Sequence, residues 1–145
     1  MNKDSLGDRI KSQYESRSQT HFPRRTYTML RLDGCHFHTL LKNCKRPFDL
    51  DVMKVMDLTA KFLCENIQGC KLAYVQSDEI TLVLTDFDTI ETQAWFDGNV
   101  QKITSVSASM ASARFNTWRL NVDAGNGDHD VHNYEYTNLA FFDSR

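Results

Sequence analysis

The sequence predicts an α+β fold of the ferredoxin-like kind, with the element order βαββαβ and two helices packed on one face of an antiparallel sheet. Three observations lead to this prediction. Four short segments are rich in strand-forming residues, two longer segments repeat apolar residues at helical spacing, and a two-residue polar link joins the second and third strand-like segments. A chain of 145 residues with 41% hydrophobic residues has room for one such domain and little more.

The first strand is expected at residues 26–32, where strand-forming residues alternate with others, and Asp33-Gly34 is expected to end it. The segment that follows, up to residue 50, has no clear period, so we expect an irregular connection. From residue 51 to residue 67, apolar side chains recur at the spacing of one helix face. Asp49 or Asp51 is expected to cap this first helix, because a carboxylate accepts hydrogen bonds from the free N–H groups of a helix's first turn.

A β-hairpin is expected next, because two strand-like runs, 71–76 and 79–85, are joined only by Ser77-Asp78. Right-handed crossover connections then place the second strand of the hairpin between the first and second strands of the sheet, antiparallel to both. The C-terminal end of the first strand consequently lies beside the hairpin tip. Asp33, Asp78 and Glu79 are therefore expected to converge at one edge of the sheet, although they are far apart in the sequence.

The second half of the chain supplies the second helix and the last strand. The helix is expected at about 90–115, and small residues in its later turns would let it lie close to the sheet. Residues 121–137 are acidic and contain Gly and Asn, which indicates a surface loop, and 139–142 resembles a final strand. These elements form the expected folded domain, 26–145, which follows a polar N-terminal arm, 1–25, with a helical stretch expected at about 6–14.

Composition and charge exclude several classes of protein. The composition is globular, no apolar run approaches the roughly 20 residues of a membrane span, and the N-terminus lacks the apolar stretch of a signal peptide. We therefore expect a cytoplasmic protein with no membrane partner, whose four cysteines are reduced thiols. The net charge of −2 argues against a general nucleic-acid binder, but residues 1–46 carry ten Lys/Arg against four Asp/Glu, which is compatible with a local anion site.

The converging carboxylates have two interpretations. Clustered carboxylates repel one another unless cations neutralise them, and hard oxygen ligands at a strand end suit Mg²⁺. Two such ions about 3.5–4 Å apart would activate an attacking hydroxyl and stabilise a leaving oxygen in phosphoryl transfer. From spacing alone, the alternative is that Asp78 is a turn residue and Asp33 a strand terminator.

The stretch Asp33–His38 is the second candidate site. Gly34 permits a close approach of the backbone, and the N–H groups that follow it are candidates for a phosphate nest. Phe37 is expected either to stack on a base or to be a core phenylalanine. The cysteine and the two histidines of this stretch lack the spacing of a closed four-ligand zinc site. Cationic residues flank the stretch at Arg24, Arg25, Arg31, Lys42, Lys45 and Arg46.

Two motifs are highly specific at their separation, namely D-G-x-x-F-H at Asp33–His38 and Q-S-D-E at Gln76–Glu79. With them, the chain resembles the tRNA(His) guanylyltransferase family of 3′–5′ polymerases, and more narrowly its bacterial and archaeal tRNA-repair branch. The resemblance spans nearly the whole chain. Further matching stretches lie at 3–9, 31–34, 46–49, 62–69, 74–80, 101–116 and 142–145.

The resemblance implies a polymerase-type palm domain and a nucleotidyltransferase that uses two Mg²⁺ ions. Carried over residue by residue, it implies that Asp33, the Gly34 carbonyl and Asp78 hold the metals, with Glu79 supporting this catalytic cluster. The implied nucleotide-binding residues are Asp33, Gly34, Cys35, His36, Phe37, His38, Ser77 and Asp78. The expected RNA and phosphate contacts are Arg24, Arg25, Arg31, Lys45 and Arg46.

The implied reaction adds nucleotides to the 5′ end of tRNA, as 5′-end repair or tRNA(His) guanylylation, after ATP or GTP has activated a 5′-monophosphate. The expected partners are tRNA and nucleoside triphosphates. A homo-oligomer is also expected, because a final strand at the sheet edge exposes unpaired backbone groups. Family members are longer, and the chain matches only their N-terminal half. Two alternatives stay open: a palm-type nucleotide-triphosphate enzyme without an RNA substrate, and a truncated nucleotide-binding subunit that pairs with a full-length partner.

Overall fold

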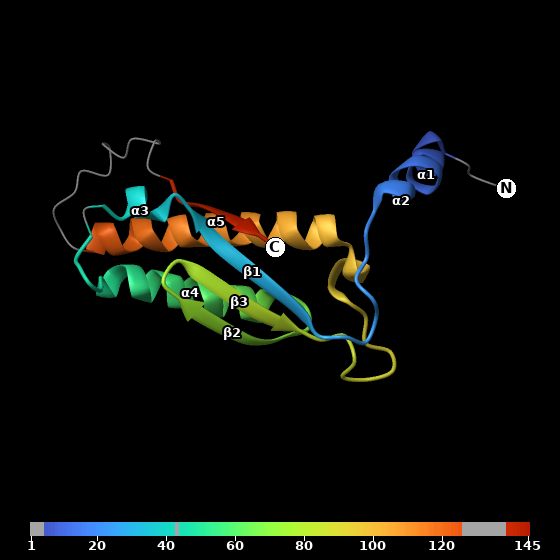
Figure 1. Cartoon of the computed structure of the whole chain (residues 1–145). Helices are drawn as coiled ribbons and strands as arrows, with labels where there is room; N and C mark the ends of the chain where they lie inside the picture. Colours follow the sequence, from blue (N-terminus) through green and yellow to red (C-terminus); the bar gives the residue numbers. More distant parts are fainter. Residues whose placement is uncertain (1–4, 43, 126–138) are drawn as a thin grey trace.

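The computed structural model describes residues 5–42, 44–125 and 139–145, and these form an α+β fold with a four-stranded antiparallel sheet. The strand order is β2-β3-β1-β4, and helices α4 and α5 both lie against one face of the sheet (Figure 1). The bounds are β1 Thr28–Cys35, α4 Leu50–Asn66, β2 Cys70–Gln76, β3 Glu79–Leu84, α5 Val100–Gly125 and β4 Phe141–Ser144. The expected βαββαβ order and the central place of the hairpin's second strand are confirmed.

The N-terminal segment is helical over a longer range than the expected 6–14. It comprises α1 (Leu6–Ile10), a π-helical turn η1 (Lys11–Glu15) and α2 (Ser16–Ser18), and no residue of these three elements is buried. Figure 1 shows α1 and α2 away from the sheet. The division into an arm, 1–25, and a domain, 26–145, stays a prediction.

The first strand does not end at Asp33-Gly34, because β4 pairs with its last residues and extends it to Cys35. The connection that follows is not wholly irregular, since Phe37–Leu40 forms the short helix α3. The N-cap of α4 is Asp49, whose side chain accepts hydrogen bonds from the N–H groups of Asp51 and Val52. Of the two expected caps, Asp49 is confirmed.

The second helix begins ten residues later than expected, at Val100. The short 3-10 turn η2 (Trp95–Gly98) precedes it, and Phe96 and Asp97 in that turn have left-handed backbone angles that no helix continues through. Asn99 then caps α5, because its side-chain oxygen accepts the Lys102 N–H at 3.0 Å. The helix extends to Gly125, so the first five residues of the loop expected at 121–137 are helical, and 126–137 lies outside the described residues.

The last strand lies two residues later than expected because Asn116 of α5 binds the backbone of Ala140. The Asn116 amide donates to the Ala140 carbonyl at 2.8 Å and accepts the Ala140 N–H at 2.9 Å. Both backbone groups of Ala140 are therefore satisfied before β4 starts. The small residues of α5 do lie close to this strand, as expected, and the Ser112 hydroxyl accepts the Phe142 N–H at 3.0 Å.

The core fills the space between the sheet and the two helices. The side chains of Leu30 and Leu32 on β1 and of Ile80 and Leu82 on β3 face the helices and are at most 2% exposed. Alternation along β1 then places Asp33 on the opposite, open face of the sheet. Among the described residues, no helix is long and apolar enough to cross a membrane.

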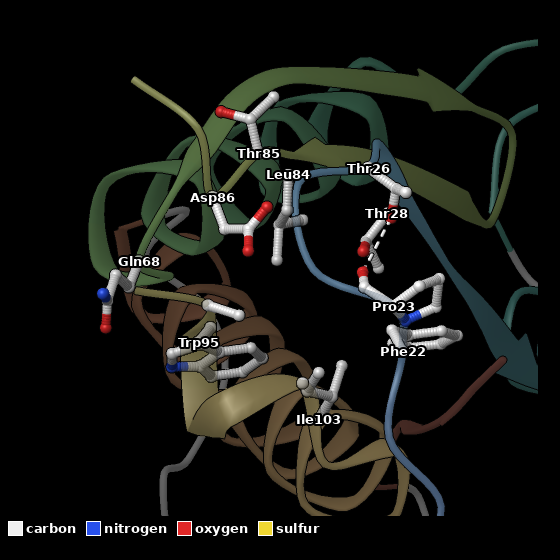
Figure 2. A pocket seen from close by; sticks show the side chains of 12 residues that line it. Phe22, Pro23, Thr26, Thr28, Gln68, Leu84, Thr85, Asp86, Trp95 and Ile103 are labelled. Atoms are coloured by element: carbon white, nitrogen blue, oxygen red, sulfur yellow. Dashed lines mark hydrogen bonds between the residues drawn. The ribbon is translucent and has the colours of Figure 1, made fainter. Parts of the chain in front are cut away.

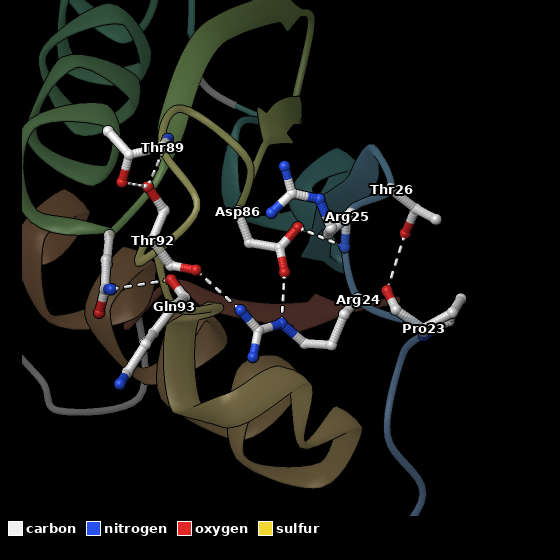
Figure 3. Close-up of polar contacts among 9 residues, drawn as sticks. Pro23, Arg24, Arg25, Thr26, Asp86, Thr89, Thr92 and Gln93 are labelled. Carbon is white, nitrogen blue, oxygen red and sulfur yellow. Dashed lines mark hydrogen bonds and ion pairs between the residues drawn. The ribbon is translucent and has the colours of Figure 1, made fainter.

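Asp86 fastens the segment before β1 to the end of β3 (Figure 3). Its buried carboxylate accepts a hydrogen bond from Arg24 Nε at 2.6 Å and from the Arg25 N–H at 2.7 Å, and Arg24 also donates to the Thr92 carbonyl at 2.7 Å. The hydrogen bond from Arg24, more than any other interaction, holds the pKa of Asp86 below its usual value of 3.8.

We expect Asp86→Asn to lower the free energy of unfolding at about pH 7, where the native carboxylate is charged. Because the folded-state pKa is depressed, this stabilisation is present above the unfolded pKa and is lost as pH falls through the folded value. The difference between variant and wild type should therefore shrink towards about pH 3 in urea titrations at the two pH values. Asp88→Asn is the control, since it breaks the exposed Lys71–Asp88 pair and should cost less. An equal loss at both pH values would contradict the assignment.

Candidate functional site

The end of β1 and the tip of the β2–β3 hairpin place Asp33, Asp78 and Glu79 at the same end of the sheet. Asp33 and Glu79 are directly paired across β1 and β3. One position further, the Gly34 N–H donates to the Asp78 carbonyl at 3.1 Å. The predicted convergence at one edge of the sheet is therefore present, and the roles of these residues stay predictions.

Arginines on the same edge neutralise two of the three carboxylates. The Arg145 guanidinium donates to Asp33 Oδ2 at 2.8 Å, and the Arg31 guanidinium lies 2.9 Å from Glu79 Oε2. The side chains of Asp33 and Glu79 are 29% and 30% exposed. The Asp33 carboxylate, with Asp143 and Glu79 near it, raises the pKa of Arg145 above its usual value. The repulsion expected from the sequence is thus offset within the chain itself.

Sequence reasoning gave no role to Arg145 or to its second partner, Asp143, whose Oδ1 lies 3.1 Å from the guanidinium. Both residues were part of a matching stretch, 142–145, so the motif was visible. Their place beside Asp33 follows only from the pairing of β4 with β1, which sets Asp33 opposite Asp143. A strand expected at 139–142 does not bring Arg145 to that position.

The residues at this edge fit a hard divalent cation. The expected ligands are two carboxylates, Asp33 and Asp78, and one carbonyl oxygen, Gly34, and such oxygen donors suit Mg²⁺. Asp33 already holds a cation, the Arg145 guanidinium. In the part of the chain that the structure describes, no three His, Cys, Asp or Glu side chains form a group that could hold a metal ion. The ligand set of Asp33, Gly34 and Asp78 therefore stays a prediction.

Gly34 is required by the packing of Phe37. A Cβ at Gly34 would lie 2.5 Å from the Phe37 ring, closer than carbon atoms approach. The ring is 2% exposed and packs against Phe115 and Phe142, with ring centroids 5.2 and 5.1 Å away. Of the two roles expected for Phe37, the core one is confirmed, and nucleotide binding by Phe37 stays a prediction.

The phosphate nest expected from the N–H groups after Gly34 stays a prediction. The Gly34 N–H is bonded to Asp78, and the His36 carbonyl accepts the Thr39 N–H at 2.9 Å in the first turn of α3. His36 has left-handed angles, φ 57° and ψ 28°, and its ring lies 6.3 Å from that of His38. The Cys35 thiol lies 4.0 Å from Asp143 Oδ2. Nucleotide binding by Cys35, His36 and His38 stays a prediction.

We call the end of the sheet that carries Asp33, Asp78 and Glu79 the carboxylate edge. A cavity of about 610 Å³ adjoins it at the hairpin tip, where Ser77 and Asp78 line the cavity. Its apolar lining residues include Leu41, Phe48, Val52, Met53 and Met56. Its polar lining residues include His38, Lys45 and Arg46. A cavity with an apolar wall, two cations and a carboxylate edge has the combination of surfaces that a nucleotide offers: a flat base and an anionic phosphate chain.

Asp49 holds in place the loop that carries two cationic lining residues of this cavity, Lys45 and Arg46. Besides capping α4, its carboxylate accepts the Lys45 N–H at 2.9 Å. The N–H groups of Lys45, Val52 and Asp51 keep the pKa of Asp49 below its usual value of 3.8. The loop that carries Lys45 and Arg46 is therefore tied to the start of α4.

The remaining expected cations are not gathered at this site. Arg24 and Arg25 precede β1, whereas Asp33 lies near its other end. The five residue steps of strand from Thr28 to Asp33 span roughly 17 Å. The Arg24 guanidinium is bound to Asp86. The RNA contacts expected of Arg24 and Arg25 stay predictions. Arg31 lies at the carboxylate edge, and Lys45 and Arg46 line the cavity.

A second cavity is too small for a ligand (Figure 2). It lies between the segment before β1 and the start of α5, with Phe22, Trp95 and Ile103 in its wall. Its volume of about 20 Å³ has room for one water molecule. The candidate site is the 610 Å³ cavity together with the carboxylate edge.

Comparison with known proteins gives consistent matches. The family model described as tRNAHis guanylyltransferase matches residues 7–145. A bacterial tRNA(His) guanylyltransferase-like protein solved in complex with ATP is 44% identical, with a TM-score of 0.82, over 98% of this chain and 57% of that one. A structure of such a protein in complex with GTP gives the same identity and TM-score, over 97% of this chain and 62% of that one. An uncharacterised protein of Acanthamoeba polyphaga mimivirus is 32% identical over 124 residues, which are 78% of this chain and 40% of that protein. The chain thus spans about half the length of the proteins it matches.

We expect Gly34→Ala to destabilise the protein by about 1–3 kcal/mol, because the added methyl group forces the buried Phe37 ring to move. Gly7→Ala is the matched control, since a Cβ there meets only Ser5 Oγ at 3.7 Å. That change in a helix should be neutral or stabilising by up to about 1 kcal/mol. Urea unfolding of both variants gives the comparison, and equal stabilities would contradict the packing argument.

Proposed function

The chain belongs to the tRNAHis guanylyltransferase family, and on that premise we propose that it is a Mg²⁺-dependent nucleotidyltransferase that adds nucleotides to the 5′ end of tRNA. The reaction would serve tRNA 5′-end repair or tRNA(His) guanylylation. The single observation that carries the proposal is the place of Asp78, which belongs to both the carboxylate edge and the wall of the 610 Å³ cavity. A nucleotide in the cavity would therefore reach Asp78 with its phosphates.

In the proposed site, Asp33, Asp78 and the Gly34 carbonyl would hold two Mg²⁺ ions. When bound, the ions supply activation of an attacking hydroxyl and stabilisation of the leaving oxygen. Glu79 supports the cluster through its ion pair with Arg31, which fixes a carboxylate beside Asp33. Because Asp33 and Glu79 sit on two hydrogen-bonded strands, their separation is set by the sheet and not by a mobile loop.

The cavity would hold the nucleotide. Val52 and Met56 of α4 give the base an apolar wall, and Lys45 and Arg46 face the phosphate chain from the loop that Asp49 anchors. Bound ATP and GTP in the two bacterial structures support a nucleotide as the ligand. The 5′-monophosphate of the tRNA would first attack the α-phosphate of ATP or GTP and release pyrophosphate. The 3′-hydroxyl of the incoming nucleotide would then attack the activated 5′-phosphate, lose its proton and displace AMP or GMP.

The RNA and a second copy of the chain are the proposed macromolecular partners. Arg31 and Arg46 lie on the same side of the fold as the carboxylates or the cavity rim, and such cations position phosphates without reading sequence. β4 lies at one edge of the sheet, and Phe141 on it is 59% exposed. An exposed apolar edge strand favours self-association. We place the protein in the cytoplasm, where its tRNA substrate would be.

Asp78→Asn should abolish nucleotide addition with little effect on folding, because it removes a metal ligand at an exposed hairpin tip. The assay is 5′-end extension of a 5′-truncated tRNA with Mg²⁺ and labelled nucleoside triphosphates. Asp57→Asn is the matched control, since Asp57 also lines the cavity but lies on α4. An active Asp78→Asn variant would contradict the two-metal assignment. Turnover of triphosphate that RNA does not stimulate would favour the enzyme without an RNA substrate.

Arg46→Met should weaken ATP binding by about 10-fold or more, because a hydrogen bond to a charged phosphate contributes roughly 1.5–3 kcal/mol. The measurement is calorimetric titration with ATP and Mg²⁺. Arg17→Met removes the same charge from the exposed helical segment before residue 20 and should leave the affinity unchanged. Equal affinities of the two variants would remove Arg46 from the proposed phosphate contacts.

A further inference from the structure

Arg145 is fixed to the first strand by its backbone. Its N–H donates to the Arg31 carbonyl at 2.9 Å, and its carbonyl accepts the Arg31 N–H at 2.7 Å. This pair lies two positions from the Asp33–Asp143 pair in the same register, so Arg145 shares the open face of the sheet with both carboxylates. The pairing of β4 with β1 therefore places the Arg145 side chain at the carboxylate edge.

The Arg145 guanidinium divides its hydrogen bonds between two carboxylates. One terminal nitrogen donates to Asp33 Oδ2 at 2.8 Å, and the other donates to Asp143 Oδ1 at 3.1 Å. A planar fork with two donors suits such a pair of acceptors. The chain thus places a positive charge directly on the carboxylate that the proposed function gives to the metal.

We propose that Arg145 is a positioning residue that holds the Asp33 carboxylate in the metal-free protein and releases it when the divalent cation binds. The inference rests on the proposed function, since it takes Asp33 as a metal ligand. Arg145 keeps the Asp33 side chain in one orientation and compensates its charge. A divalent cation that binds Asp33 must therefore displace the Arg145 guanidinium. The metal affinity of the site is therefore set in part by an internal competitor.

The exchange is energetically accessible because the ion pair is solvated. The side chain of Arg145 is 56% exposed, and exposed ion pairs are weak. Competition of this strength corresponds to a change of about 2- to 5-fold in a dissociation constant. After the exchange, Arg145 keeps its hydrogen bond to Asp143, so the guanidinium charge still has a carboxylate partner.

Electron paramagnetic resonance of free Mn²⁺ tests the inference by measuring the dissociation constant of the Mn²⁺ site that Asp33→Asn removes. Arg145→Met should tighten Mn²⁺ binding about 2- to 5-fold, and Arg145→Lys, which keeps the charge without the fork, should fall between Arg145→Met and wild type. Arg31→Met is the matched control: it removes the same charge from the adjacent position but contacts Glu79, and its effect should be smaller. Unchanged or weaker binding by Arg145→Met would overturn the inference, as would equal effects of Arg145→Met and Arg31→Met.

Thermal unfolding with and without Mn²⁺ separates positioning from a merely structural role. Without metal, Arg145→Met should melt below wild type, and saturating Mn²⁺ should remove the difference because the cation then compensates Asp33. An equal deficit in both conditions would overturn the inference and leave the proposed function standing. If the wild-type chain shows no Mn²⁺ site that depends on Asp33, the two-metal assignment itself fails, and the role of Arg145 fails with it.

Discussion

The antiparallel pairing of β1 with β3 is the constraint on which the site depends. It sets Asp33 opposite Glu79, and it ties the Gly34 N–H to the Asp78 carbonyl at the hairpin tip. A slip of one residue would move Asp33 from the open face of the sheet to the face covered by α4 and α5. The buried side chains of Leu30 and Leu32 prevent such a slip, since it would expose both of them to water. The core of the protein thereby determines which carboxylates meet.

Charge compensation completes the edge. Three carboxylates at the end of two strands would repel one another, yet Arg31 and Arg145 lie on the same face and each binds one of them. At the cavity, Asp49 caps α4 and binds the backbone of the loop that carries Lys45 and Arg46. The candidate site therefore consists of a carboxylate edge with its own counter-charges and a cavity with an anchored cationic rim.

Much of this arrangement could be predicted from the sequence, because the relevant signals are local. Helical and strand periodicity gave the βαββαβ order, and handedness of the crossovers gave the neighbours of β3. The features that escaped prediction depend on contacts between distant segments. The start of α5 depends on left-handed Phe96 and Asp97, the start of β4 depends on Asn116 of α5, and the Arg145–Asp33 pair joins residues 112 positions apart. Burial of the Phe37 ring likewise depends on Phe115 and Phe142, which no local pattern pairs with it.

The central claim is that Asp33 and Asp78 hold divalent cations beside a nucleotide in the 610 Å³ cavity. Crystals of the chain grown with Mn²⁺ and a non-hydrolysable ATP analogue test it most directly, because anomalous scattering locates the manganese. The account predicts anomalous peaks within coordination distance of the Asp33 and Asp78 carboxylates, with the base against Val52 and Met56. Manganese at any other place in the chain, or a nucleotide outside the cavity, would contradict it.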